Sequence, residues 1–290
     1  MPPGYTPTRA YPVVLYLHMA SVDEHYFLGA EQVAELDGMI RSGLFPPAII
    51  AAPDGLADGR NRINDPHSFF LNGKHGRFED HLLYEVMPFL ASHYSVRPEP
   101  AAHALLGFSG GGLGAASIAM RRPDVFGVVA VISAPLNLRY TTCDGDSRED
   151  FDPATFRWKT TYDPDEIVGV FNFGLQRVPA KKHIAPVFGD DPAEVFARVS
   201  AINPADLLFT TSPAPGRPAM FVASGGRDNW NFDAQSGSFL WLAKQRGFPV
   251  DSYHDPRGRH ALPYFHRGED AALRWLAGHI LPPVDLAARP

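Results

Sequence analysis

One serine stands in a glycine-rich stretch whose residue types suit nucleophilic catalysis. Ser109 lies in HALLGFSGGGLGA, residues 103–115, where an apolar, strand-like run is followed directly by residues that favour a helix. A strand, then G-x-S-x-G, then a helix is the pattern of a nucleophile elbow, in which a tight turn exposes a serine hydroxyl above a sheet. The amino end of the following helix favours negative charge beside that hydroxyl. The pattern predicts that Ser109 is a nucleophile; the alternatives are a phosphate-binding turn and a purely structural one.

A serine hydroxyl attacks a carbonyl only when a base accepts its proton, so a histidine is expected elsewhere in the chain. Of the twelve histidines, His260 follows the last strand-like run and precedes the terminal helix. Loops in that position collect the functional groups of α/β sheets. His254 is expected inside the strand and His266 at the start of the helix. We therefore predict that His260 is the base.

The base needs an acid that fixes its tautomer and stabilises the imidazolium. Asp228 follows FVASGGR at the end of the preceding strand-like run, which is the equivalent position after a strand. Asp233 is the second candidate, and Asp255 is close to the histidine in sequence but less well placed. The resulting chain order of Ser109, Asp228 and His260 is the order found in α/β-hydrolases.

These three side chains require a sheet that holds them at one edge. Most of the strand-like runs are continuously apolar, as expected of parallel strands that are covered on both faces. The six runs are residues 11–19, 46–54, 101–109, 127–135, 218–226 and 249–256. Apolar residues with helical spacing lie between them, so the chain is expected to form a doubly wound, mostly parallel sheet with right-handed crossovers. We predict one α/β domain of the α/β-hydrolase fold over residues 1–290.

Residues 136–217 interrupt the alternation of strands and helices. The interval is rich in aromatic residues and prolines, and it far exceeds the roughly 2–6 residues of an ordinary loop in such folds. We predict an inserted, cap-like segment over the active site; the alternative is a packed excursion that does not touch the substrate. Trp158, Phe171 and Trp230 are candidates for the substrate pocket, although aromatic side chains are also ordinary core material.

Composition excludes several classes of function. A net charge of −6 argues against a nucleic-acid partner, and charged residues or prolines interrupt every apolar stretch, so no membrane partner is expected. A single cysteine rules out an internal disulfide. Residues 144–152 are acidic but lack the pattern of a calcium loop, and no histidine pair has zinc-binding spacing, so we expect no metal and no cofactor. No signal peptide is visible, which leaves a cytoplasmic and a secreted location open.

Several motifs together carry a resemblance to a known family. The phrases LHMASVDEHYF, FEDHLLYEVMPFL, GFSGGG, SGGRD and RGRH resemble the family named "putative esterase". That family includes esterase D (S-formylglutathione hydrolase), feruloyl and acetyl-xylan esterases, enterochelin esterases and the mycolyltransferase antigens. The likeness covers nearly the whole chain except residues 136–217. It implies a serine esterase that acts on a small-molecule or carbohydrate ester through an acyl-enzyme.

The resemblance also bears on the oxyanion hole, which needs two backbone donors. The N–H of Gly110, directly after the nucleophile, is one donor by its position. By resemblance, the second is the N–H of Ala20, with Met19 as the alternative. Met19 stands where the family usually has glycine, and Gly110 stands where it usually has methionine or another larger residue. Both differences alter the wall near the serine, so Met19 is also a candidate for the substrate pocket.

Two other functions and one partner follow from these observations. The alternatives to hydrolysis are acyl transfer to a sugar or another alcohol and, in a different class, a non-catalytic binding module with the same fold. In the strand order of α/β-hydrolases, the run at 46–54 lies outside the run at 11–19. In the family, further strands normally precede the phrase PPGYTPTRAYPVVLYLHM and would cover this outer run. We therefore predict that the natural product begins upstream of Met1, or that another segment or a second copy, forming a homodimer, pairs with residues 47–52.

Overall fold

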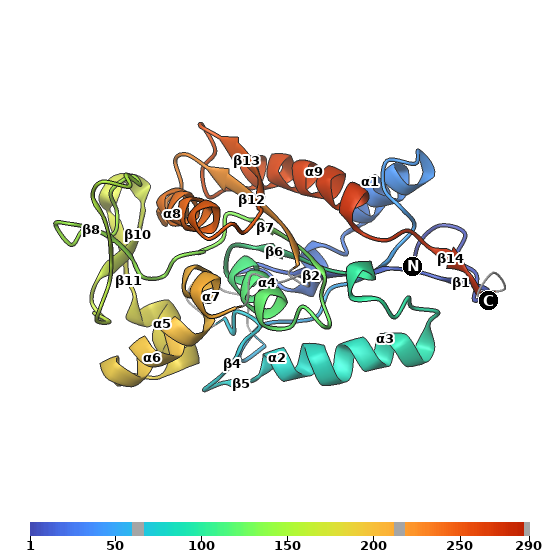
Figure 1. Cartoon of the computed structure of the whole chain (residues 1–290), viewed down its shortest axis with the longest axis horizontal. Coiled ribbons are helices and arrows are strands. Elements are labelled where there is room, and N and C mark those ends of the chain that lie inside the picture. The colour runs from blue at the N-terminus through green and yellow to red at the C-terminus, as the bar shows by residue number, and fades with distance from the viewer. Residues whose placement is uncertain (60–66, 212–217, 287–290) are drawn as a thin grey trace.

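A parallel sheet forms the centre of the molecule (Figure 1). The computed structural model describes residues 1–59, 67–211 and 218–286. Within them, six strands lie in the order β13-β12-β7-β6-β2-β3, and each neighbouring pair is parallel. Their bounds are β2 (Val13–Leu17), β3 (Ile49–Ala51), β6 (His103–Phe108), β7 (Val128–Ile132), β12 (Ala219–Gly225) and β13 (Asp251–Asp255). The six predicted runs thus match six strands of one sheet, and β3 is the outer neighbour of β2, as predicted.

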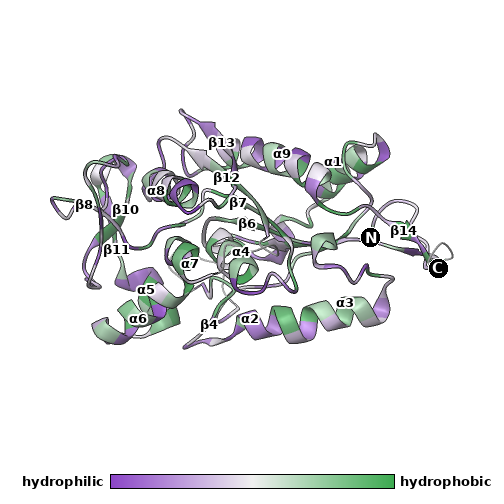
Figure 2. Ribbon diagram, viewed as in Figure 1, coloured by the Kyte–Doolittle hydropathy of each residue, from purple (hydrophilic) through white to green (hydrophobic). Residues whose placement is uncertain are grey.

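Helices cover both faces of this sheet. Buried residues of α1 and α9 share one hydrophobic cluster with the sheet, and those of α3, α4, α7 and α8 share the other. In Figure 2, α3 and α9 carry both hydrophobic and hydrophilic residues, as expected of helices with one buried side. The bounds are α1 (Ala30–Arg41), α2 (Phe78–His81), α3 (Met87–His93), α4 (Ser109–Arg121), α8 (Phe232–Gln245) and α9 (Leu262–His279), with short helical turns η1 (Glu24–Tyr26), η2 (Leu82–Val86) and η3 (Pro100–Ala102).

The residues of β2 explain why the strands are almost entirely apolar. Val13, Leu15 and Leu17 belong to the cluster that contains α4, whereas Val14 and Tyr16 belong to the cluster that contains α9. All five are buried. Successive side chains of a strand point to opposite faces, so a strand covered on both sides has no position left for a polar residue.

The chain between β7 and β12 adds a group of elements, most of which lie at the carboxyl ends of the strands. In Figure 1 the hairpins, α5 and α6 gather at the end of the molecule opposite the two termini, whereas α7 lies beside α4. Among the residues of this segment that the structure describes, two antiparallel hairpins, one short helical turn and three helices make up the group. Their bounds are β8 (Tyr140–Thr142), β9 (Phe156–Trp158), β10 (Ile167–Phe171), η4 (Asn172–Gly174), β11 (Gln176–Pro179), α5 (Lys181–Phe188), α6 (Pro192–Ile202) and α7 (Pro204–Thr210).

Short strand pairs complete the fold. They are β1 (Arg9–Ala10) with β14 (Val284–Asp285), and β4 (Asn72–Gly73) with β5 (Gly76–Arg77). Among the helices of the described residues, none has the length and apolar character that crossing a bilayer requires.

Candidate active site

Ser109 occupies a strained turn between a central strand and a helix. It is the first residue of α4 and follows β6 directly. Its φ angle is 51°, in the left-handed region that residues other than glycine rarely adopt and that is common at functional sites. At Gly111, an added Cβ would come within 2.2 Å of the carbonyl oxygen of Leu17. A glycine at that position therefore lets α4 begin close against the end of β2.

A chain of two hydrogen bonds runs from this serine to a buried carboxylate. His260 Nε2 lies 3.0 Å from Ser109 Oγ, and His260 Nδ1 lies 2.8 Å from Asp228 Oδ2. Because a carboxylate can only accept, Nδ1 carries the proton and Nε2 is free to accept the proton of the serine. The side chains of His260 and Asp228 are 9% and 1% exposed. The rings of Phe232 and Phe265 meet the imidazole edge-on at centroid distances of 5.4 and 5.0 Å.

The other candidates for the acid and the base lie apart from this chain. Asp233 accepts a hydrogen bond from an amide of its own helix, and burial raises the pKa of its carboxyl. Asp255 accepts from Arg267 Nε at 2.9 Å. His254 lies within β13, where its Nδ1 is 3.0 Å from Ser224 Oγ. The structure therefore brings together the three residues that the sequence analysis preferred.

Ser133 belongs to this group of residues, and the sequence analysis missed it. Its Oγ donates to Asp228 Oδ2 at 2.8 Å, while the N–H of Trp230 donates to Oδ1 at 2.8 Å. Ser133 directly follows β7, is 1% exposed and has a φ of 47°. Its position just after a central strand is the only signal in the sequence that could have found it.

Both predicted oxyanion donors belong to residues that line the cavity beside the serine. Gly110 lies in the first turn of α4, where amides have no partner within a helix, and Ala20 lies in the loop after β2. His18 holds that loop in place. Its Nδ1 donates to the carbonyl of Met19 at 2.9 Å, and its Nε2 accepts from the N–H of Gly55 at 2.8 Å.

An aromatic ring fills the space beside Gly110. A Cβ at this position would lie 2.8 Å from Cδ1 of Phe69, so the ring of Phe69 occupies the space that a side chain at position 110 would need. The N–H of Phe69 donates to His67 Nδ1 at 2.9 Å. Burial, followed by the charges of His18 and His183, holds the pKa of His67 well below its usual value, so this imidazole is neutral.

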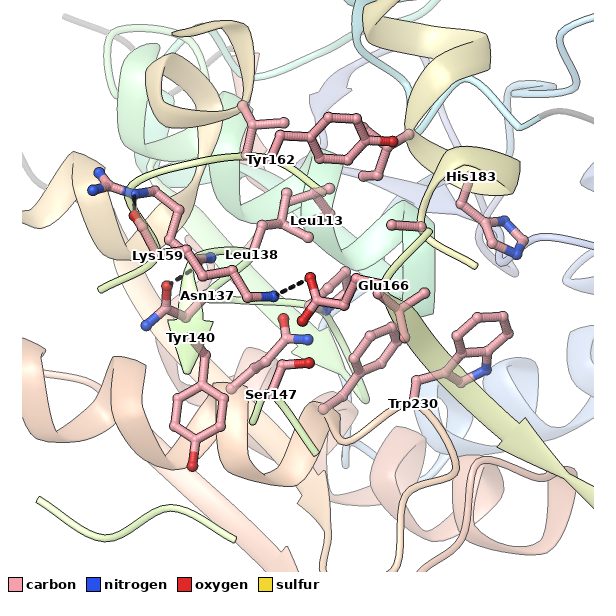
Figure 3. Close-up of a pocket in the computed structure, with 18 of the residues that line it drawn as sticks. Leu113, Asn137, Leu138, Tyr140, Ser147, Lys159, Tyr162, Glu166, His183 and Trp230 are labelled. Atoms are coloured by element: carbon pink, nitrogen blue, oxygen red, sulfur yellow. Dashed lines mark hydrogen bonds and ion pairs between the residues drawn. The ribbon is translucent and has the colours of Figure 1, made fainter. Parts of the chain in front are cut away.

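A cavity of about 130 Å³ opens on Ser109 (Figure 3). Residues of α4 and of the loops after the strands form part of its wall. Most of the remaining lining residues come from the chain between β7 and β12, namely Asn137, Leu138, Arg139, Tyr140, Ser147, Lys159, Thr161, Tyr162, Glu166, Val168, Ala180, His183, Ile184, Phe196 and Val199.

Of the four side chains predicted to line the substrate pocket, Trp230 lines this cavity. The lining residues within the described chain do not include Met19, Trp158 or Phe171, so a role for these three in substrate binding stays a prediction. Met19 is buried in the core cluster that contains α9. Cζ of Arg139 lies 5.1 Å from the centroid of the Trp158 ring. The rings of Phe171 and Trp230 meet edge-on, with their centroids 5.1 Å apart.

The fold and the site together define the class of α/β-hydrolases. The sheet is central and parallel, and the serine stands on a strained turn after β6. The histidine follows β13, and the aspartate follows β12. Comparison with known families agrees with this class. The chain belongs to the Esterase family, described as "Putative esterase", whose model matches residues 1–230. The protein is accordingly a carboxylic ester hydrolase.

Solved structures share the fold at low sequence identity. One is a ferulic acid esterase, with a TM-score of 0.67 and 18% identity over 94% of this chain and 87% of that one. Another is the S-formylglutathione hydrolase of Agrobacterium tumefaciens, with a TM-score of 0.62 and 14% identity over 94% and 85%. A third is the substrate-bound, fluorophosphonate-binding serine hydrolase F of Staphylococcus aureus, with a TM-score of 0.56 and 14% identity over 94% and 86%.

Proposed function

We propose that the protein cleaves carboxylic esters through an acyl-enzyme on Ser109. The observation that carries the proposal is the continuous chain from Ser109 Oγ through His260 to Asp228, with distances of 3.0 and 2.8 Å. A serine hydroxyl is a weak nucleophile until a base within hydrogen-bond reach removes its proton, and the base needs a third group to orient it. Both requirements are met by these contacts.

The proposed reaction has two similar halves. Ser109 Oγ attacks the ester carbonyl while its proton passes to His260 Nε2, and Asp228 stabilises the resulting imidazolium. The N–H groups of Gly110 and Ala20 hold the negative oxygen of the tetrahedral intermediate. The imidazolium then gives its proton to the leaving alcohol, which departs and leaves the acyl group on the serine. Water, which gives a proton to the same histidine, attacks the acyl-enzyme. The imidazolium then returns this proton to Ser109 Oγ as the bond to the acyl carbon breaks, and the acid is released.

We also assign the choice of substrate to the chain between β7 and β12, which is the segment predicted to cover the active site. Support comes from the cavity, because most of its lining residues belong to this segment. Residues of the sheet edge position the reacting groups, whereas this segment sets the shape and polarity of the remaining wall. We therefore expect substitutions in this segment, and not in the sheet, to change which esters the enzyme prefers.

Replacement of the nucleophile tests the proposal. We expect Ser109→Ala to lower the turnover of 4-nitrophenyl acetate by about 10⁴-fold or more, with little change in the melting temperature. Ser117→Ala is the matched control, because it removes a serine from the same helix at a position that does not line the cavity. A fluorophosphonate probe should label the wild type and the control but not Ser109→Ala. Turnover or labelling that survives in Ser109→Ala would overturn the mechanism.

A further inference from the structure

Two opposite charges meet in the wall of the cavity that opens on Ser109. Lys159 Nζ donates to Glu166 Oε2 at 2.6 Å, and both side chains are lining residues. They are 19% and 21% exposed, respectively. Figure 3 shows the two side chains reaching toward one another across the cavity. An ester that fills this cavity therefore meets an ion pair in addition to apolar side chains.

Backbone hydrogen bonds fix the position of this pair. Lys159 directly follows β9, and its N–H donates to the carbonyl of Arg139 at 2.8 Å while its own carbonyl accepts from Arg139 Nε at 3.0 Å. Glu166 directly precedes β10, and its carbonyl accepts from the N–H of Ala180 at 2.8 Å. The main chain at both residues is thus held by residues from other parts of the segment.

Stability of the fold alone does not explain an ion pair in this wall. Partly buried charges lose hydration, and their mutual attraction offsets this loss incompletely, so apolar side chains of similar size would often serve as well. Val168 and Ile184, which line the same cavity, show that apolar residues are accommodated here. The pair is better explained by a bound group that uses both charges.

Two further polar atoms belong to the same wall. Tyr162 Oη and Gln235 Oε1 are buried in lining residues and have no hydrogen-bond partner among the residues that the structure describes. Burial, helped by carboxylates that include Glu166, raises the pKa of Tyr162 to about 12, so its hydroxyl keeps the proton that it donates. The amide oxygen of Gln235 can only accept. Hydrogen-bond donors and acceptors are therefore both present in this wall.

We infer that the part of the cavity around Lys159 and Glu166 binds a neutral hydroxylated group of the ester, carried by its acyl or its alcohol moiety. A hydroxyl both donates and accepts, so it satisfies the carboxylate and the ammonium together. A carboxylate only accepts and is repelled by Glu166, and an ammonium only donates and is repelled by Lys159. A plain alkyl group removes water from both charges and forms no hydrogen bond with either of them. This inference rests on the proposed function, because it names the substrate of the same site.

Matched esters that differ in one distal group test the inference. In the acyl arm, kcat/KM is measured for 4-nitrophenyl hexanoate and for its derivatives with a terminal hydroxyl, carboxylate or ammonium. In the alcohol arm, release of butanoic acid is titrated from propyl butanoate and from 2,3-dihydroxypropyl butanoate. We expect the hydroxylated ester to exceed the plain one by about tenfold or more in one arm. The two charged acyl esters should fall below hexanoate. The arm that shows the preference assigns the hydroxyl to the acyl or to the alcohol moiety.

Double variants connect this preference to the ion pair. We expect Lys159→Met with Glu166→Gln to bring the hydroxyl preference to within about twofold of unity, since neutral side chains no longer penalise an alkyl group. Lys181→Met with Asp165→Asn is the matched control. It removes an ion pair of the same length, 2.6 Å, from residues that do not line the cavity, and it should keep the preference. Lys159→Glu with Glu166→Lys exchanges the two charges and should also keep the hydroxyl preference. This variant gives a second test if the neutral double variant folds poorly.

Each outcome bears on the inference separately from the proposed function. Equal or better turnover of the plain esters in both arms would overturn it, as would a hydroxyl preference that survives in the neutral double variant. Hydrolysis of 4-nitrophenyl acetate, whose acyl group has no distal part, reports on the triad alone. Wild type that hydrolyses acetate but ignores the hydroxyl refutes only the inference. Wild type that hydrolyses no ester refutes the proposed function and, with it, the inference.

Discussion

Ser133 Oγ donates to the same carboxylate oxygen of Asp228 that faces His260 Nδ1, and both distances are 2.8 Å. Ser133 is not among the described residues that line the cavity, so we expect its effect on catalysis to pass through the carboxylate. A hydroxyl that donates to a carboxylate both orients it and withdraws part of its charge. We therefore regard Ser133 as a positioning residue for the proposed acid.

Removal of this hydroxyl should slow the enzyme. A hydrogen bond to a charged group contributes about 1.5–3 kcal/mol, so we expect Ser133→Ala to lower kcat/KM by about tenfold or more. Ser133→Gly is the control, because glycine adopts the φ of 47° without strain. If Ser133→Gly were fully active, the backbone and not the hydroxyl would explain the loss.

Gly110 and Phe69 should be coupled, because the ring takes the space of a side chain at position 110. We expect Gly110→Ala to reduce kcat/KM at least tenfold, since the new Cβ pushes the first turn of α4 and its N–H groups away from their positions. In the double variant with Phe69→Ala, part of this activity should return. A double-mutant cycle on kcat/KM measures the coupling. Strictly additive losses would show that the ring and position 110 do not compete for the same space.

His67 should make the folded protein sensitive to acid. Its pKa is lowered by burial in the folded state, whereas in the unfolded chain it is about 6.5. Below that pH the unfolded state binds more protons than the folded state, so stability is complete above about pH 6.5 and falls as the pH drops toward the lowered pKa. Urea unfolding at several pH values should show this loss. It should be smaller in His67→Gln, which cannot become charged, and unchanged in His93→Gln, an exposed control. Equal acid sensitivity of wild type and His67→Gln would contradict the assignment.

The outer strand β3 allows a direct test of the predicted pairing near residues 47–52. The N–H of Ile49 donates to the carbonyl of Pro12, so the amide and carbonyl of Ile50 face away from β2 because backbone groups alternate along a strand. If a second copy pairs here, light scattering should detect a dimer. Ile50→Pro should return it to a monomer, since proline removes a donor only from the open edge. A wild-type protein that is monomeric at its highest soluble concentration would rule out pairing between copies at this edge.

The residues of the proposed triad could be located from sequence because each one follows a strand. Continuous apolar runs mark buried parallel strands, and the carboxyl ends of such strands meet at one edge of the sheet, so Ser109, Asp228 and His260 were expected to lie together. The glycines around the serine also carry local information, because they mark where α4 packs against β2. Both signals come from residues that are neighbours in the sequence.

Contacts between distant segments left no such local signal. The bond from Ser133 to Asp228 joins residues 95 positions apart, and the fit of Phe69 against Gly110 depends on how a loop folds over the helix. The residues around Lys159 and Glu166 in the sequence do not indicate that these two charges pair in the wall of the cavity. Aromatic residues of the same segment, such as Trp158, packed elsewhere. Sequence patterns specify which face of an element is buried, whereas only tertiary packing decides which buried side chain meets which partner.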